Sequence, residues 1–180
     1  MRLLLDLRNI KNPSEREQLA SEADEHGIWG VVVTAQRGAE CVEASSIATV
    51  TNHVVVVVDI DGHDVHPTTL AEEISVLDQI AQRRTMVIFR GPPNSETTLR
   101  TLLSGLPSDG FILSPPPAQA SIPVHLPEEI PQVDLPEDPS EAAAIIDLHR
   151  DSLAALLIIK ANKSSKELAR HLVSLSLIHI

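Results

Sequence analysis

The chain has 180 residues, of which 43% are hydrophobic, and its 14 lysines and arginines stand against 25 aspartates and glutamates, for a formal net charge of −11. This size is sufficient for one domain with a real core, which must be aliphatic because there are only two Phe, one Trp and no Tyr. The negative charge and the shortage of aromatic stacking surfaces argue against nucleic acid as a partner.

The single cysteine, Cys41, excludes an internal disulfide framework and fits a reducing compartment. Residues 1–11 lack the long apolar stretch and the small-residue cleavage site of a secretion signal. No apolar run approaches the roughly 20 residues that are needed to cross a bilayer. We therefore expect a cytoplasmic protein with no membrane partner.

Short aliphatic runs alternate with helical patterns in the first half of the chain. Strands are expected at 3–7, 29–34, 54–59 and 86–90, with a helix between each pair. The first helix has a capping-box start at Ser14 and Glu17 and ends at Gly27. The run 54–59 is mostly valine, which is typical of a parallel strand buried on both faces. The apolar residues expected to face inward from these helices are Leu19, Ala20 and Ala23, then Val42, Ala44, Ile47 and Ala48, then Leu70, Ile74, Leu77 and Ile80 or Ala81.

The pattern is less regular in the second half. Asn94 or Ser95 is expected to cap a helix that closes at Gly105. The remaining expected elements are a strand at 110–114, a proline-rich irregular segment at 115–139 with one possible strand at 122–126 and no helix, a helix that begins at Asp138, a helix or strand at 153–160, a helix that starts at Ser164, and a last strand or helix end at 177–180.

This alternation predicts an α/β fold with parallel strands. Counting every candidate gives as many strands as a (β/α)₈ barrel has, but the chain is short against the about 250 residues that such a barrel usually takes. We expect one TIM-barrel-like domain over residues 1–180, reduced or incomplete. An open, doubly wound sheet is the alternative, although no strand is followed by a GxGxxG or Walker A motif.

The segment 66–91 carries a set of short motifs in a fixed order. They are His66-Pro67, Leu70-Ala71-Glu72, Leu77-Asp78-Gln79, Arg83-Arg84 and Arg90-Gly91. In this order they resemble the fourth βα region of the bacterial luciferase-like flavin monooxygenase family, which includes F420-dependent oxidoreductases. Segments 23–29 and 48–51 are similar to other passages of that family, so the resemblance covers residues 15–95. The sequence departs from the family at 34–37, Thr-Ala-Gln-Arg, where the family usually carries an active-site His.

The resemblance implies a flavin- or deazaflavin-linked oxidoreductase that binds FMN or F420 over the carboxyl ends of its strands. Arg90 matches the arginine that contacts the flavin in the family. Asp59, Thr34 and Asp6 end neighbouring strands and are expected beside it in the cofactor site, while the catalytic residues stay unknown. The family dimerises through helices near its second and third strands, which implies a homodimer here.

The residues alone leave other interpretations open. Arg90 at a strand end can form a salt bridge to Asp59 or Asp6 instead of holding an anion. The corresponding function is that of a non-catalytic, degenerate barrel protein that acts in binding or assembly. The other residues expected at the carboxyl ends of the strands are Arg8, Gln36, Arg37, Asp61, Ser114, His125 and Lys160.

The segment 59–66 concentrates carboxylates and imidazoles at Asp59, Asp61, His63, Asp64 and His66. Such a cluster can bind a divalent metal in a lyase or hydrolase. Its spacing matches no known motif, so we expect a solvated loop before a helix and no metal. Lys160 is a Schiff-base candidate without a recognisable partner, and Cys41 is expected to be a small core residue.

Overall fold

The computed structural model describes residues 2–134, 136, 138, 141–142, 144–145, 148 and 156–160. Its helices are α1 (Pro13–Glu25), α2 (Glu40–Val50), α3 (Pro67–Ile80), α4 (Pro93–Leu103) and the short 3₁₀ helix η1 (Pro127–Glu129). Its strands are β1 (Arg2–Asp6), β2 (Gly30–Val33), β3 (Val55–Asp61), β4 (Thr85–Arg90), β5 (Val124–His125), β6 (Gln132–Val133) and β7 (Leu156–Lys160).

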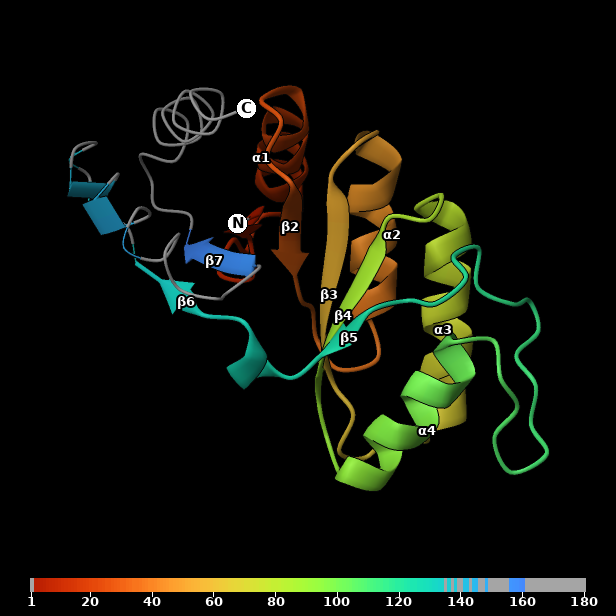
Figure 1. Cartoon of the computed structure of the whole chain (residues 1–180). Coiled ribbons are helices and arrows are strands. Elements are labelled where there is room, and N and C mark those ends of the chain that lie inside the picture. Colours follow the sequence, from red (N-terminus) through yellow and green to blue (C-terminus); the bar gives the residue numbers. More distant parts are fainter. Residues whose placement is uncertain are drawn as a thin grey trace.

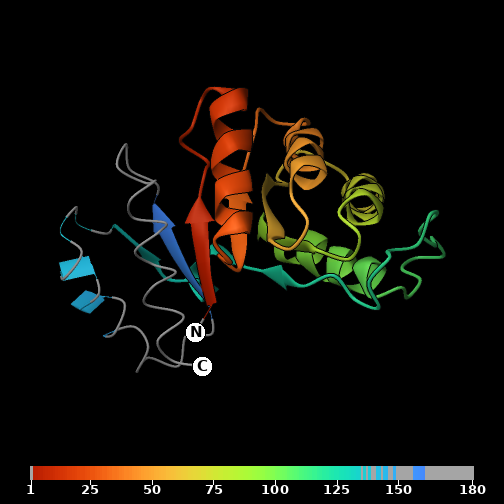
Figure 2. The same ribbon diagram turned by 90° about the horizontal axis from the view of Figure 1, so that it is seen from above.

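The strands form one parallel sheet in the order β5-β4-β3-β2-β1-β7-β6. This is the strand order of a barrel that is open between β5 and β6. Helices α1 to α4 lie along one side of the strands, which curl into an open half-barrel (Figures 1 and 2). The prediction of an incomplete TIM-like barrel is therefore confirmed. A doubly wound sheet would carry helices on both of its faces.

Each face of the sheet has its own apolar cluster. The larger cluster fills the space between helices and strands and includes Val56 and Val58, while Val57 belongs to a smaller cluster on the concave face. This alternation follows from the opposite directions of successive side chains in a strand. The concave cluster comprises Leu4, Val32, Val57, Met86, Ile88, Ile130 and Ile158. The predicted burial of the valine strand on both faces is thus confirmed.

The concave cluster is covered in part by the segment that joins the two edge strands. Residues 126–131 run from β5 to β6 and contain η1 (Figure 1). Ile130 of this segment is 3% exposed and packs on the concave cluster. The predicted strand at 122–126 is therefore present as β5, but the proline-rich segment also holds a 3₁₀ turn and a further strand, which the sequence did not indicate.

The first helix has its N-cap two residues before Ser14, the N-cap that the capping-box pattern predicts. Asn12 is the N-cap, and its side-chain oxygen accepts a hydrogen bond from the backbone N–H of Ser14 at 3.1 Å. Proline at the first helical position suits this start because its missing N–H needs no partner there. The predicted end is confirmed, since Gly27 has a φ of 74° and follows the C-cap His26.

Two other local predictions are wrong. Val42 is 72% exposed rather than inward. Of the two alternatives for the last inward position of α3, Ala81 is fully buried and Ile80 is 40% exposed, so the prediction is confirmed for Ala81. Helix α4 is preceded by Pro92 as N-cap, not by Asn94 or Ser95, which lie in its first turn.

Segment 110–114 is not a strand, because its only ladder contact is an isolated antiparallel bridge between Ser108 and Phe111. Ile112 in this segment is 69% exposed. The segment 153–160 supplies β7 at Leu156–Lys160. Of the helix expected from Asp138, residues 141, 142, 144, 145 and 148 are helical, and the predictions for 164–180 lie outside the described residues.

Two charged side chains stabilise the turn at the amino ends of the strands. Asp24 accepts hydrogen bonds of 2.7 Å from each backbone N–H of residues 52, 53 and 54. Arg84 donates hydrogen bonds to the backbone carbonyls of Ala48, Thr51 and Val54. It thereby supplies donors to carbonyls at the C-terminal end of α2 that have no partner within the helix. Both contacts fix the turn between α2 and β3. Among the described helices, none is long and apolar enough to cross a membrane.

Candidate functional site

The carboxyl ends of the first four strands bring together the four residues for which the sequence predicts a cofactor site. Asp6 ends β1, Thr34 follows β2, Asp59 lies in β3 and Arg90 ends β4. Parallel strands present these ends at one edge, so the side chains share one surface. Asp6 and Asp59 are 2% and 1% exposed, which means that both carboxylates need partners.

Arg8 is the partner that joins the two buried carboxylates. Its Nε and Nη2 atoms donate to the two oxygens of Asp6 at 2.9 and 2.8 Å, and its Nη1 atom donates to Asp59 Oδ2 at 2.6 Å. Both carboxylates point to the concave side, because they lie two residues beyond Leu4 and Val57 of the concave cluster. The hydrogen bond to Asp6, followed by that to Asp59, raises the pKa of Arg8 although burial lowers it.

Arg8 was expected at this edge from the sequence, but not as the bridge between two strands. The signal for its local contact is the spacing Asp6-x-Arg8 directly after a strand, which allows a side chain to fold back on its neighbour. The longer contact to Asp59, 51 positions away in the chain, depends on the order of the strands and has no local signal.

Arg90 forms the salt bridge that the residues alone allowed. Its Nη2 atom lies 3.0 Å from Asp59 Oδ1 in an ion pair without hydrogen-bond geometry. Asp6 is held by Arg8 instead. The side chain of Arg90 is 48% exposed, in contrast to the 19% of Arg8. Arg90 is therefore a charged group at this edge that a bound molecule can reach.

Two polar side chains complete the edge. The hydroxyl of Thr34 donates to the backbone carbonyl of Asp59 at 3.0 Å. The side-chain amide of Gln132 in β6 donates to Asp6 Oδ2 at 3.2 Å. Gln132 was not singled out in the sequence, because it comes from a two-residue strand within the proline-rich segment. The edge thus contains two carboxylates neutralised by two guanidinium groups.

The segment 59–66 is tied by ion pairs to the preceding loop. Arg37 lies 2.6 Å from Asp64 and 3.7 Å from Asp61. His63 Nδ1 lies 2.7 Å from Asp61, and this hydrogen bond is the main cause of the lowered pKa of Asp61. Within the part of the chain that the structure describes, no group of three or more His, Cys, Asp or Glu is placed to hold a metal ion.

The remaining predicted residues fall into separate places. His66 is the N-cap of α3, as expected for a helix start. His125 in β5 lies 3.2 Å from Glu129 Oε2. Ser114 does not end a strand, and Lys160 ends β7 with its side chain outside the described part.

The sequence matches no protein-family model and no curated protein. Solved structures do match. The monooxygenase RslO1 from Streptomyces bottropensis has a TM-score of 0.59 at 15% identity, over 98% of this chain and 79% of that one. The coenzyme F420-dependent tetrahydromethanopterin reductase from Methanopyrus kandleri has a TM-score of 0.62 at 12% identity, over 98% of this chain and 62% of that one.

A third match names FMN. It is the oxygenating constituent of 3,6-diketocamphane monooxygenase from Pseudomonas putida in complex with FMN, with a TM-score of 0.52 at 11% identity, over 98% of this chain and 61% of that one. At these identities the likeness shows the fold. The chain spans less than two thirds of the second and third of these proteins and about four fifths of the first. Over the compared residues the chain therefore has the fold of these monooxygenases and of the F420-dependent reductase, as its sequence motifs predicted.

Proposed function

We propose that this protein binds FMN or F420 over the carboxyl ends of β1 to β4 and acts as a flavin- or deazaflavin-linked oxidoreductase. The observation that carries the proposal is the half-exposed guanidinium of Arg90, held beside a buried carboxylate at the edge where this fold presents its ligands. The fold is shared with proteins whose names specify F420 or FMN.

The residues at this edge fit such a cofactor in a limited way. Arg90 offers a cation to an anionic ring or phosphate. Asp59 holds Arg90 in place from one side, and Arg8 donates a hydrogen bond to Asp59 from the other. Thr34 donates its proton to a backbone carbonyl, so its hydroxyl oxygen is left as an acceptor. Asp6 is enclosed by Arg8 and Gln132 and serves to position Arg8 rather than to touch a ligand.

A bound flavin or deazaflavin supplies hydride transfer, and the protein contributes position and electrostatics. If Arg90 turns from Asp59 to a bound cofactor, Asp59 still has a partner, because the Nη1 atom of Arg8 donates a hydrogen bond of 2.6 Å to it. The edge therefore tolerates movement of Arg90 at a small electrostatic cost.

The experiment is an equilibrium titration of the protein with FMN and with F420, followed by fluorescence. Arg90→Ala is expected to weaken binding by at least about tenfold, the loss typical of a charged hydrogen-bonding partner. Arg37→Ala is the matched control, because Arg37 is 45% exposed and is likewise paired with carboxylates. Equal binding by both variants would contradict the role of Arg90.

A non-catalytic binding protein is the second candidate. It is favoured by the balanced pairing at the edge, where both guanidinium groups already face carboxylates, and by the Thr-Ala-Gln-Arg sequence at 34–37 in place of a histidine. This candidate predicts a colourless protein that binds neither FMN nor F420 in the same titration.

A further inference from the structure

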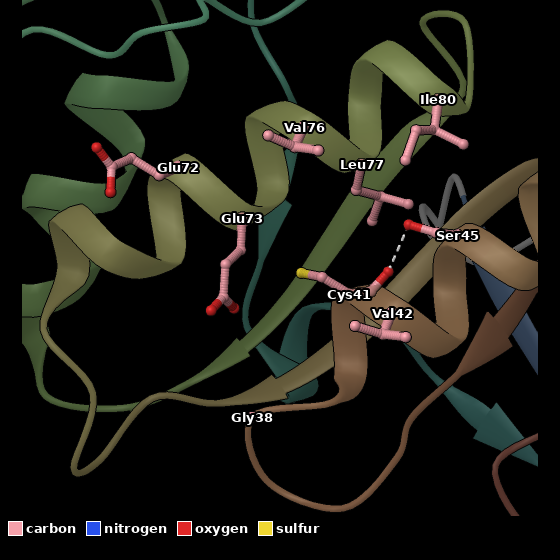
Figure 3. A pocket seen from close by; sticks show the side chains of 9 residues that line it. All are labelled: Gly38, Cys41, Val42, Ser45, Glu72, Glu73, Val76, Leu77 and Ile80. Atoms are coloured by element: carbon pink, nitrogen blue, oxygen red, sulfur yellow. Dashed lines mark hydrogen bonds between the residues drawn. The ribbon is translucent and has the colours of Figure 1, made fainter.

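Two hollows on the helical layer of the described chain differ in their chemistry. The hollow between α2 and α3 has aliphatic walls (Figure 3), and it lies on the face through which the family resemblance implies a homodimer. The second hollow, of about 430 Å³, lies between the starts of α3 and α4 and the turn at 108–111, and we call it the polar pocket. Its volume falls within the about 300–1,000 Å³ that is typical of small-molecule sites.

The turn at 108–111 is a tight hairpin that closes one side of the polar pocket. The backbones of Ser108 and Phe111 exchange two hydrogen bonds, of 3.1 and 2.8 Å. Asp109 and Gly110 lie between them with φ values of 49° and 79°, and a type I′ turn needs a positive φ at both positions. The turn therefore fixes Asp109 at the exposed rim of the polar pocket, whereas Phe111 is a half-buried part of its lining.

Much of the hydrogen-bonding capacity of the polar pocket is unused. In the described part of the chain, five of the side chains that line it have no hydrogen-bond or ion-pair partner, namely those of Asn94, Ser95, Thr98, Ser108 and Asp109. The contrast is plain within α4. Thr97 and Thr101 donate to backbone carbonyls four residues earlier, at 3.0 and 2.9 Å, whereas the hydroxyl of the half-buried Thr98 does not.

The unused groups indicate the kind of molecule that the polar pocket can hold. Hydroxyl and amide side chains both donate and accept hydrogen bonds, whereas a carboxylate only accepts them. The described residues that line the pocket include one carboxylate, Asp109, and no lysine or arginine, so they suit neither an anion nor a metal ion. They match a neutral ligand whose own groups both donate and accept, as the hydroxyls of a sugar do.

We propose that the polar pocket binds a neutral monosaccharide. The hydroxyls of Ser95, Thr98 and Ser108 exchange hydrogen bonds with those of the sugar, and the carboxylate of Asp109 accepts stronger, charge-assisted ones. The ring of Phe111 offers the C–H groups of the sugar an apolar surface whose face is electron-rich. None of the residues at the carboxyl edge of the strands lines this pocket, so sugar binding is independent of FMN and F420.

The test is a titration of the full chain with D-glucose, D-galactose and D-mannose in turn, with the dissociation constant measured by saturation-transfer difference NMR. At least one of the three sugars is expected to bind saturably. Thr98→Val keeps the shape of the side chain and removes its hydroxyl, so it is expected to weaken binding by about threefold or more. Thr97→Val is the matched control, because Thr97 is the neighbouring position of α4 and does not line the polar pocket. It is expected to bind the sugar as the unmodified protein does, and circular dichroism checks the fold of both variants.

Asp109→Asn distinguishes a sugar from an anion. Asparagine tolerates the positive φ of this turn, so the substitution removes the charge and keeps the backbone. It is expected to weaken sugar binding by about fivefold or more, because charge-assisted hydrogen bonds become neutral ones. Inorganic phosphate, titrated in the same way and followed by phosphorus NMR, is expected to show no saturable binding to either protein.

Three outcomes overturn the proposal. They are the absence of saturable binding of all three sugars, equal sugar binding by Thr98→Val and Thr97→Val, and saturable phosphate binding that Asp109→Asn strengthens. The last outcome assigns the polar pocket to an anion. None of these results depends on whether the protein binds FMN or F420.

Discussion

The ion-pair cluster at the carboxyl edge makes Asp59→Asn the most informative single substitution. Asp59 is 1% exposed and faces Arg8 at 2.6 Å and Arg90 at 3.0 Å. Loss of its charge leaves Arg8 with one carboxylate in place of two. Removal of one partner from a buried ion pair costs about 3–5 kcal/mol. Arg8 keeps its two hydrogen bonds to Asp6, and Arg90 is half exposed to water, so we expect the lower end, about 3 kcal/mol.

The assay is urea unfolding of the unmodified protein and of Asp59→Asn, with the free energy of unfolding extrapolated to water. Asp61→Asn is the control, because Asp61 is two residues along the same strand but its side chain is 48% exposed, and an ion pair in water contributes little to stability. If Asp59→Asn and Asp61→Asn destabilise the protein equally, the edge is not held together by Asp59 and our reasoning is refuted.

Three further predictions follow from other contacts. Desolvation raises the pKa of Asp24, but three backbone hydrogen bonds outweigh it and lower the pKa. The contribution of Asp24 to stability is therefore complete above about pH 4 and is lost as the pH falls through the lowered pKa of the folded state. Asp24→Asn should lower the free energy of unfolding by about 1–2 kcal/mol at pH 7 and flatten the acid limb of its pH profile. Burial, then the charges of Glu73 and Glu40, raises the pKa of Cys41 to about 12, so iodoacetamide at pH 8 should label the thiol in urea and not in the native protein, which mass spectrometry measures. A Cβ on Gly91 would lie 2.5 Å from Cζ of the buried Phe89 ring, so Gly91→Ala should lower the free energy of unfolding by about 1–3 kcal/mol, whereas no thermal shift would show that the ring has room to move.

Periodicity predicted the helical layer well. The apolar stripe of α3 has the spacing of one helix face. The valine run has the length and the β-branched composition of a strand that is buried on both faces. Val42 was predicted to face inward because the apolar residues of α2 are spread around the helix, so their pattern does not distinguish the side that faces the sheet from the outer side. The segment 110–114 has the composition of a strand, but it contributes only an isolated bridge. Composition alone does not distinguish such a bridge from a strand that pairs along its length.

The residues of the candidate site and the salt bridge between Arg90 and Asp59 were predictable from the sequence, whereas the contacts of Arg8 and Gln132 were not. Parallel strands bring Asp6, Asp59 and Arg90 to one edge, and this follows from the alternation of elements. The bridge by Arg8 and the contact of Gln132 depend on which strands are neighbours and on how the segment 126–131 crosses to β6. Such long-range contacts leave no local trace in the sequence.

The absorbance spectrum of the purified protein, recorded after incubation with FMN or with F420 and desalting, tests the central claim most directly. The account predicts a retained flavin band or a retained band near the 420 nm deazaflavin absorbance, present with Arg37→Ala and lost with Arg90→Ala. A protein that retains neither cofactor, with its fold intact by circular dichroism, would contradict the oxidoreductase proposal and support a non-catalytic half-barrel.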